Sequence, residues 1–83
     1  MEKKIVLSMR PNKDIVITMN NVEKLTIESS NRNIDASAIY KLLDYSKNDT
    51  YTVESLNEPN IDKPVLSFFS NLIIDIADKL RSM

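Results

Sequence analysis

Three short segments near the N-terminus alternate apolar and polar residues, and this pattern constrains the fold more than any other feature of the chain. The alternation covers residues 5–9, 15–19 and 22–28, and a period of two places the apolar side chains of each segment on one face of a β-strand. Asn20 and Asn21 separate the second segment from the third. Asparagine tolerates the left-handed conformation that a two-residue hairpin turn requires. The sequence therefore predicts a three-stranded antiparallel meander.

The rest of the chain predicts two helices and one further strand. Residues 36–46 place apolar side chains on one helical face. Residues 51–56 contain Tyr, Thr and Val, which favour a strand, and their poor alternation indicates an edge or half-covered strand. The last helix follows Asp62, a candidate N-cap, and runs from Pro64 to about Leu80. Its apolar arc comprises Val65, Leu66, Phe68, Phe69, Leu72, Ile73, Ile76, Ala77 and Leu80.

The expected fold is a single α+β domain over residues 1–83, with the element order β-β-β-α-β-α. Asp35 is the candidate N-cap of the first helix. The simplest arrangement is an antiparallel meander sheet with both helices packed on one face, and the last helix, which has the broadest apolar arc, is expected to lie centrally.

The chain contains no glycine, cysteine or histidine, and these absences exclude several kinds of chemistry. Without cysteine there is no disulfide, thiol nucleophile or thiolate metal site, and without histidine there is no imidazole base or ligand. Phosphate-cradling loops depend on glycine. Asp75 and Asp78 could face one cation from a helix, but no third ligand lies nearby in the sequence. We therefore expect no enzymatic activity, no cofactor and no metal site.

The start of the chain lacks the features of a targeting signal. Residues 1–4 are mostly polar or charged, and the apolar run at residues 5–7 is far shorter than the core of a signal peptide. No segment approaches the roughly 20 apolar residues of a membrane span. These features predict a cytoplasmic protein without membrane contact.

Acidic residues gather between positions 44 and 62, where Lys47 is the only basic residue. Such a surface would favour a protein partner with a basic surface. Tyrosines suit interfaces because they combine an aromatic body with a polar tip, and an exposed Ile74 would extend an apolar strip on the last helix. The candidate partner-binding residues are Asp44, Tyr45, Asp49, Tyr51, Glu54, Glu58, Asp62 and Ile74. The alternative interpretation is an ordinary solvated surface, with the tyrosines covering the edges of the core.

These features together predict a small non-enzymatic protein-binding module. The small size, the lack of glycine and cysteine, and the abundance of asparagine, isoleucine and lysine resemble the small proteins of low-GC phages and mobile elements. Many such proteins, anti-CRISPR proteins among them, inhibit host machinery by occupying one of its surfaces. The resemblance implies an inhibitor or modulator of that kind, but it involves no family motif and assigns no residue.

Two other functions remain open. A basic strand face could contact nucleic acid, although a pI near 5.3 and the absence of phenylalanine from the expected strands argue against direct binding. The basic residues in question are Lys3, Lys4, Arg10, Lys13, Lys24 and Arg32. Alternatively, the chain could be a structural homodimer subunit that associates with itself through residues 64–81.

Overall fold

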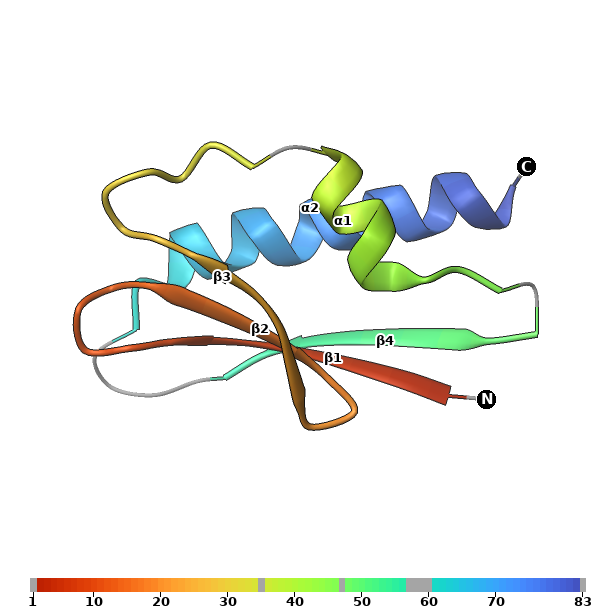
Figure 1. Ribbon diagram of the computed structural model, residues 1–83, viewed down its shortest axis with the longest axis horizontal. Helices are drawn as coiled ribbons and strands as arrows, with labels where there is room; N and C mark the ends of the chain where they lie inside the picture. The colour runs from red at the N-terminus through yellow and green to blue at the C-terminus, as the bar shows by residue number, and fades with distance from the viewer. Residues whose placement is uncertain (1, 35, 47, 57–60, 83) are drawn as a thin grey trace.

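A four-stranded sheet forms one layer of the molecule, and two helices form a second layer on one of its faces (Figure 1). The computed structural model describes residues 2–34, 36–46, 48–56 and 61–82. The elements are β1 (Glu2–Met9), β2 (Ile15–Met19), β3 (Val22–Ile27), α1 (Ala36–Leu43), β4 (Thr50–Ser55) and α2 (Lys63–Arg81). This order confirms the predicted α+β fold with the sequence β-β-β-α-β-α.

The sheet is mixed, with the strand order β3-β2-β1-β4. The first three strands form the predicted antiparallel meander, whereas β4 pairs with β1 in parallel register, Ile5 opposite Val53. β1 and β3 both run antiparallel to β2, so β1, β3 and β4 all run in the same direction. The segment between β3 and β4 must therefore carry the chain back to the end of the sheet where β1 begins. It does so through α1, as a crossover connection between strands of the same direction. The expected edge strand is therefore confirmed, and its parallel direction makes the sheet mixed.

The hairpin between β2 and β3 turns without glycine, as predicted. Asn20 and Asn21 have φ angles of 52° and 68°, the left-handed pair that a two-residue turn of this kind requires. The side chain of Asn20 also accepts a hydrogen bond from the backbone N–H of Lys4 at 2.9 Å. A third left-handed residue, Lys13 with φ of 73°, closes the turn between β1 and β2.

The core lies between the helices and the sheet face on which the apolar positions of β1 and β2 meet. Cross-strand pairing places Ile5 beside Met19 and Leu7 beside Ile17, all of them buried. The helices cover this face with buried aliphatic and aromatic side chains, namely Ile39, Leu42, Leu43, Leu66, Phe69, Ile73, Ile76 and Ala77. Neither of the two described helices lies on the opposite face of the sheet (Figure 1).

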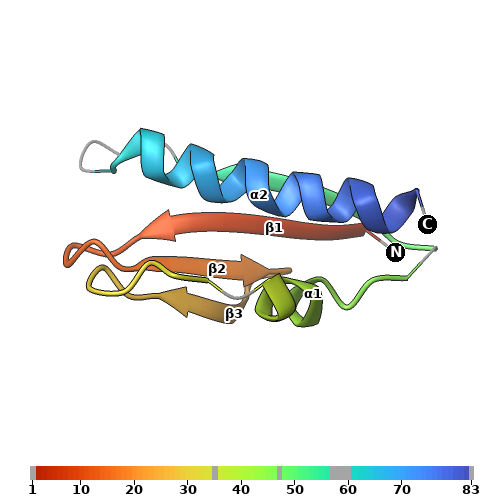
Figure 2. The same ribbon diagram turned by 90° about the horizontal axis from the view of Figure 1, so that it is seen from above.

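The two helices divide the covered face between them. In Figure 2, α2 lies along β1 and β4, and α1 lies over the β2–β3 side near one end of the sheet. The last helix is therefore not central, in contrast to the expectation, because α1 occupies the other side. Asp62 caps α2 as predicted, since its carboxylate accepts a hydrogen bond from the N–H of Val65 at 3.4 Å. The expected cap of α1, Asp35, lies outside the described residues.

The end of α1 differs from the expectation. The helix ends at Leu43 rather than at Ser46, because Asp44 adopts φ of 43° and leaves the helical conformation. A left-handed residue directly after the last turn is a common helix stop, usually made by glycine. A chain without glycine makes it here with an aspartate, which tolerates this conformation better than most residues do.

Two neighbouring phenylalanines on α2 have opposite environments. Phe69 is 4% exposed and belongs to the core, whereas Phe68 is 63% exposed. Assigning Phe68 to the buried arc was therefore wrong, because at 100° per residue it lies more than a quarter turn from the centre of the buried residues. Ile74, the apolar residue on the polar side of the helix wheel, is exposed as the sequence suggested.

Candidate interaction site

The acidic residues between positions 44 and 62 do not form one surface. Asp49 is nearly buried in an ion pair with Lys3, and the exposed Glu54 lies 3.4 Å from Lys4 on the uncovered face of the sheet. Asp62 caps α2, and the side chain of Asp44 is exposed at the end of α1. Glu58 lies outside the described residues.

Lys3 is the centre of a polar cluster that joins β1, α1 and β4. Its Nζ lies 3.0 Å from Oδ2 of Asp49 and donates to the backbone carbonyl of Asp44 at 2.8 Å. The Tyr51 hydroxyl donates to the carbonyl of Leu43 at 2.9 Å. Helix ends leave carbonyl groups without intrahelical partners, and a cation is favourable there. The Lys3 cluster therefore caps α1 and attaches it to the sheet.

The Lys3–Asp49 ion pair shifts the pKa of both partners. Burial disfavours the charged lysine, but the hydrogen bond to Asp49 and the attraction of nearby Tyr51, Asp49 and Asp44 outweigh it and raise the pKa of Lys3 above 10.5. The hydrogen bond from Lys3 lowers the pKa of Asp49 below 3.8. Both groups are therefore charged across the neutral range, and neither is suited to exchange protons there.

The predicted interface tyrosines contact each other. The rings of Tyr45 and Tyr51 stack at 5.9 Å between centroids with 12° between their planes, and the Nζ of Lys3 lies 5.6 Å from the centre of the Tyr51 ring. Both tyrosines are half-buried. Tyr45 lies beyond the end of α1, although the sequence placed it within the helix expected over residues 36–46. The third tyrosine, Tyr40, is exposed on α1.

The basic residues of the strands do not form a continuous cationic face. Lys3 lies on the covered face, in phase with Ile5 and Leu7, which is a signal that the alternation of β1 already contained. On the uncovered face, Lys4 pairs with Glu54, and Nη2 of Arg10 lies 3.3 Å from Oε1 of Glu23. Alternating charge of this kind offers phosphate groups little net attraction.

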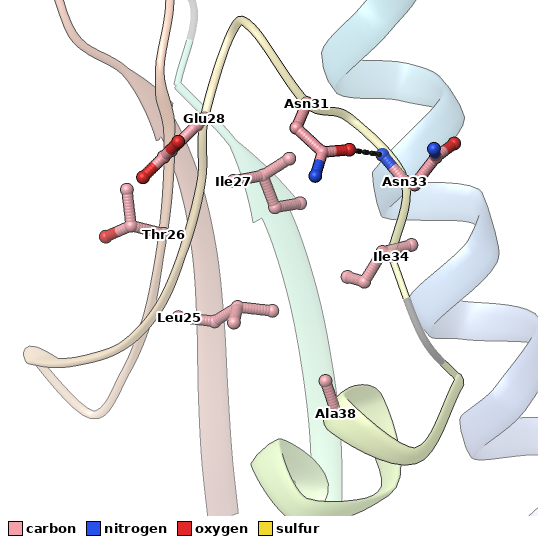
Figure 3. A pocket seen from close by; sticks show the side chains of 8 residues that line it. All are labelled: Leu25, Thr26, Ile27, Glu28, Asn31, Asn33, Ile34 and Ala38. Carbon is pink, nitrogen blue, oxygen red and sulfur yellow. Dashed lines mark hydrogen bonds between the residues drawn. The ribbon is translucent and has the colours of Figure 1, made fainter.

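A hollow of about 330 Å³ opens between β3 and the connection to α1 (Figure 3). Leu25, Ile27 and Ile34 point toward its centre, while Asn31 turns aside to accept a hydrogen bond from the N–H of Asn33 at 3.2 Å. The hollow exists because α1 is too short to cover the whole β2–β3 side. Glu28 is the only ionisable residue among its lining, and Figure 3 shows its carboxylate pointing away. The hollow thus brings together no acid–base pair.

The two edges of the sheet differ in what they offer to a partner. Along β3, the pairing with β2 shifts register between Ile17 and Thr18, which leaves Lys24 as an extra residue in a bulge between Glu23 and Leu25. Along β4, six consecutive residues stay in register with β1. Bulges and charged residues protect an edge strand from pairing, and β4 has no bulge.

The outer side of β4 presents backbone groups at alternate residues. The N–H of Leu56 donates to the carbonyl of Leu7 at 2.9 Å, so the backbone groups at even positions of this strand face β1. The backbone groups of Tyr51, Val53 and Ser55 therefore face outward, because successive residues of a strand point their N–H and C=O to opposite sides. Among the described strands, β1 is the only partner of β4.

One side of α2 continues this edge. Ser55, Leu56 and Ser67 line a shallow hollow between the end of β4 and the start of α2, and Ile74 lies two turns further along the same side of the helix. Leu56 is 42% exposed and Ile74 is 38% exposed. We call this surface the β4 surface, and its residues are Tyr51, Val53, Ser55, Leu56, Ser67 and Ile74. The β4 surface includes two of the predicted partner-binding residues, Tyr51 and Ile74, but none of the predicted carboxylates.

Sequence reasoning missed the β4 surface because an edge is defined by long-range pairing. The alternation of a strand shows which face is buried, but it does not show which strand lies beside it. In the described part of the chain, no three acidic side chains gather closely enough to hold a metal ion. Within the same residues, neither helix combines the length and the apolar character needed to cross a membrane. No protein-family model, no curated protein and no solved structure matches this chain.

Proposed function

We propose that this chain is a non-enzymatic protein-binding module that binds another polypeptide by adding a strand to the outer edge of β4. The observation that carries the proposal is the regular, unbulged edge of β4 beside exposed Leu56 and Ile74, in contrast to the bulged edge of β3. Strand addition needs no glycine loop, imidazole or thiol, and main-chain hydrogen bonds supply the affinity.

The side chains around the edge supply the other half of such a contact. Val53 is half-buried beneath α2, so a strand added beside it would extend the apolar layer under the helix. Ile74 and Leu56 lie on the same side and would be buried by a partner. Burial of apolar surface contributes a binding free energy of about 25 cal/mol per Å². Backbone bonding and apolar burial would then act at one surface.

The ionisable side chains support a binding role over a catalytic one. Lys3 and Asp49 hold α1 to the sheet, and Lys4 and Glu54 pair across two strands. Asp62 caps a helix. General acid–base catalysis needs a titratable group placed beside a substrate pocket with its pKa near the working pH, and the pKa shifts at the Lys3 cluster run in the opposite direction.

A strand-forming peptide tests the proposal directly. The probe is a peptide of four Thr-Val repeats with a lysine at each end, titrated into isotopically labelled protein while backbone amide shifts are followed by NMR. We expect the largest shifts at Tyr51, Val53 and Ser55. Shifts confined to β3, or no shifts at millimolar peptide in a sample dilute enough to be monomeric, would contradict strand addition at β4.

Two substitutions at one position supply the matched control. Ser55→Pro removes the outward N–H, and proline is tolerated where an edge N–H faces solvent. Ser55→Ala keeps that donor. A hydrogen bond contributes about 1 kcal/mol, so we expect about fivefold weaker peptide binding for Ser55→Pro and no change for Ser55→Ala. Equal weakening in both variants would assign the effect to the serine side chain instead of the backbone.

A further inference from the structure

Resting on the proposed function, we propose that the polypeptide that occupies the β4 surface is a second copy of this chain. Two β4 strands would pair antiparallel across a twofold axis and join two four-stranded sheets into one of eight strands. A twofold contact uses the same surface on both subunits, so that surface must be complementary to itself. The β4 surface meets this condition at the strand, at the helix and in its charges.

The strand is self-complementary when Val53 lies on the twofold axis. Val53 then faces its own copy, and Tyr51 faces Ser55 of the second copy, so each outward-facing backbone group of these residues has a partner. On the uncovered face, Glu54 comes opposite Thr52 rather than opposite another carboxylate. Like charges directly opposite each other would destabilise the pair, and this register avoids them.

The same arrangement brings α2 of one copy against α2 of the other. α2 contacts both β4 and β1 and lies along that side of the sheet (Figure 2). Neighbouring strands are about 4.8 Å apart, so two helices that each lie over a β1–β4 pair would have axes about 10 Å apart. Packed helices lie 8–10 Å apart. Pairing of the strands therefore brings the helices into contact without any rearrangement.

The contacting side of α2 has the residues that such an approach needs. Ser67, Ser70 and Ile74 follow one another at the spacing of a helix–helix contact, and two of the three are small. An antiparallel crossing centred between Ser70 and Asn71 places Ser67 opposite Ile74 of the second copy. A small Ser67 side chain thus leaves room for the larger Ile74 of the other copy on both sides of the axis.

Charge fits the same crossing. Lys63 and Asp78 are equally far from its centre, so Lys63 of each copy comes opposite Asp78 of the other. Both side chains are exposed, and among the described residues the ion pair of Asp78 is a 4.0 Å contact with Arg81 on its own helix. Two opposite-charge pairs per dimer would favour this direction of the helices over the parallel one.

Ser70 lies at the centre of the proposed crossing. Ser70 is 9% exposed, and its Oγ has no hydrogen-bond partner among the described residues. A buried polar atom without a partner is costly and uncommon. Because its own chain already covers this hydroxyl, what Ser70 brings to the centre of the crossing is a small side chain that lets the second helix approach closely.

Sedimentation equilibrium tests the proposal with two matched variants of α2. The wild-type chain should approach twice its 9.5 kDa mass as concentration rises. Ile74→Lys places a charge in the helix contact and should raise the dimer Kd about tenfold or more. Phe68→Lys changes a more exposed residue that lies about a third of a turn away around the same helix, and it should leave the Kd within about twofold of wild type. A monomeric wild type, or equal effects of the two variants, would overturn the second-copy proposal.

A charge-reversal cycle tests the register. Lys63→Glu and Asp78→Lys should each weaken the dimer, and the double variant should regain the wild-type Kd, because only it restores opposite charges. Additive weakening in the double variant would overturn the antiparallel crossing. The two proposals also fail separately: a monomeric chain that binds the Thr-Val peptide retains strand addition and loses the second copy. If Ser55→Pro leaves the dimer Kd unchanged and the chain does not bind the peptide, strand addition itself is wrong.

Discussion

The two edge strands of the sheet have equal length, but one edge is protected from further pairing and the other is not. β3 carries Glu23 and Lys24, and its pairing is interrupted at the bulge. β4 has one charge, Glu54, which points to the uncovered face, and its register is unbroken. The same chain thus protects one edge by charge and irregular pairing and leaves the other able to accept a strand.

The difference between the two edges shows which side of the sheet is left less covered. On the β3 side the chain itself passes over the sheet toward α1 (Figure 2), whereas on the β4 side Ser67 and Ile74 of α2 are left exposed. An unprotected edge next to exposed apolar residues is unfavourable in an isolated chain and favourable in a complex. The contrast between the edges is therefore the strongest structural sign of binding in this molecule.

The largest expected effect concerns the attachment of α2 over the β4 side. Phe69→Ala removes a nearly buried ring and should lower the free energy of unfolding by about 3–5 kcal/mol. Phe68→Ala, one residue away and 63% exposed, should change it by less than about 1 kcal/mol. Urea denaturation followed by circular dichroism measures both. Similar losses in the two variants would mean that α2 is rotated from the position described and that the β4 side is covered differently.

The next effect concerns the Lys3 cluster, which secures the beginning of β4. Lys3→Met leaves Asp49 without its ion pair and the carbonyls at the end of α1 without their donor, so we expect a clear loss of stability, smaller than that of Phe69→Ala. Lys3→Arg, which keeps the charge, should retain part of the stability. Equal stability of wild type and Lys3→Met would show that the cluster does not hold β4 in place.

The pH dependence of this ion pair has a definite sign. The pKa of Asp49 is lowered in the fold, so its contribution is present above about 3.8 and is lost as pH falls through the lowered folded value. The pKa of Lys3 is raised, so its contribution is complete below 10.5 and is lost as pH rises through the raised folded value. The difference in stability between wild type and Lys3→Met should therefore be constant across the neutral range and shrink at both extremes. A difference that changes within the neutral range, or that stays the same at both extremes, would contradict the ion pair.

The sequence was sufficient to predict the elements and insufficient to predict their partners. Alternation within β1 identified its buried face, and it also placed Lys3 on that face, although the residue was first considered part of a basic surface. The early end of α1 depends on the left-handed Asp44, a conformation that aspartate permits but does not require. The parallel pairing of β4 depends on a crossover of more than twenty residues. No local pattern specifies such a crossover, so the candidate site at its edge could not be predicted either.

A further prediction converts one edge into the other. Deleting Lys24 removes the extra residue of the bulge and should give β3 a regular outer edge, so that the protein forms assemblies larger than a dimer. Lys24→Thr removes the charge but keeps the bulge and should leave the association state of wild type. Sedimentation velocity distinguishes these outcomes. Larger assemblies in both variants would show that charge, and not the bulge, protects β3.

The smallest expected effect separates charge from backbone at the β4 edge. Glu54 and Lys4 are 60% and 56% exposed in their ion pair, and surface pairs of this kind contribute about 0–1 kcal/mol. Glu54→Lys should therefore leave the free energy of unfolding within about 1 kcal/mol of wild type. It should also change the dimer Kd by less than about threefold, because the side chain faces Thr52 of the second copy. A tenfold change in association with unchanged stability would instead assign binding to the acidic side chains that the sequence first indicated. The open backbone of β4 would then be incidental to the contact.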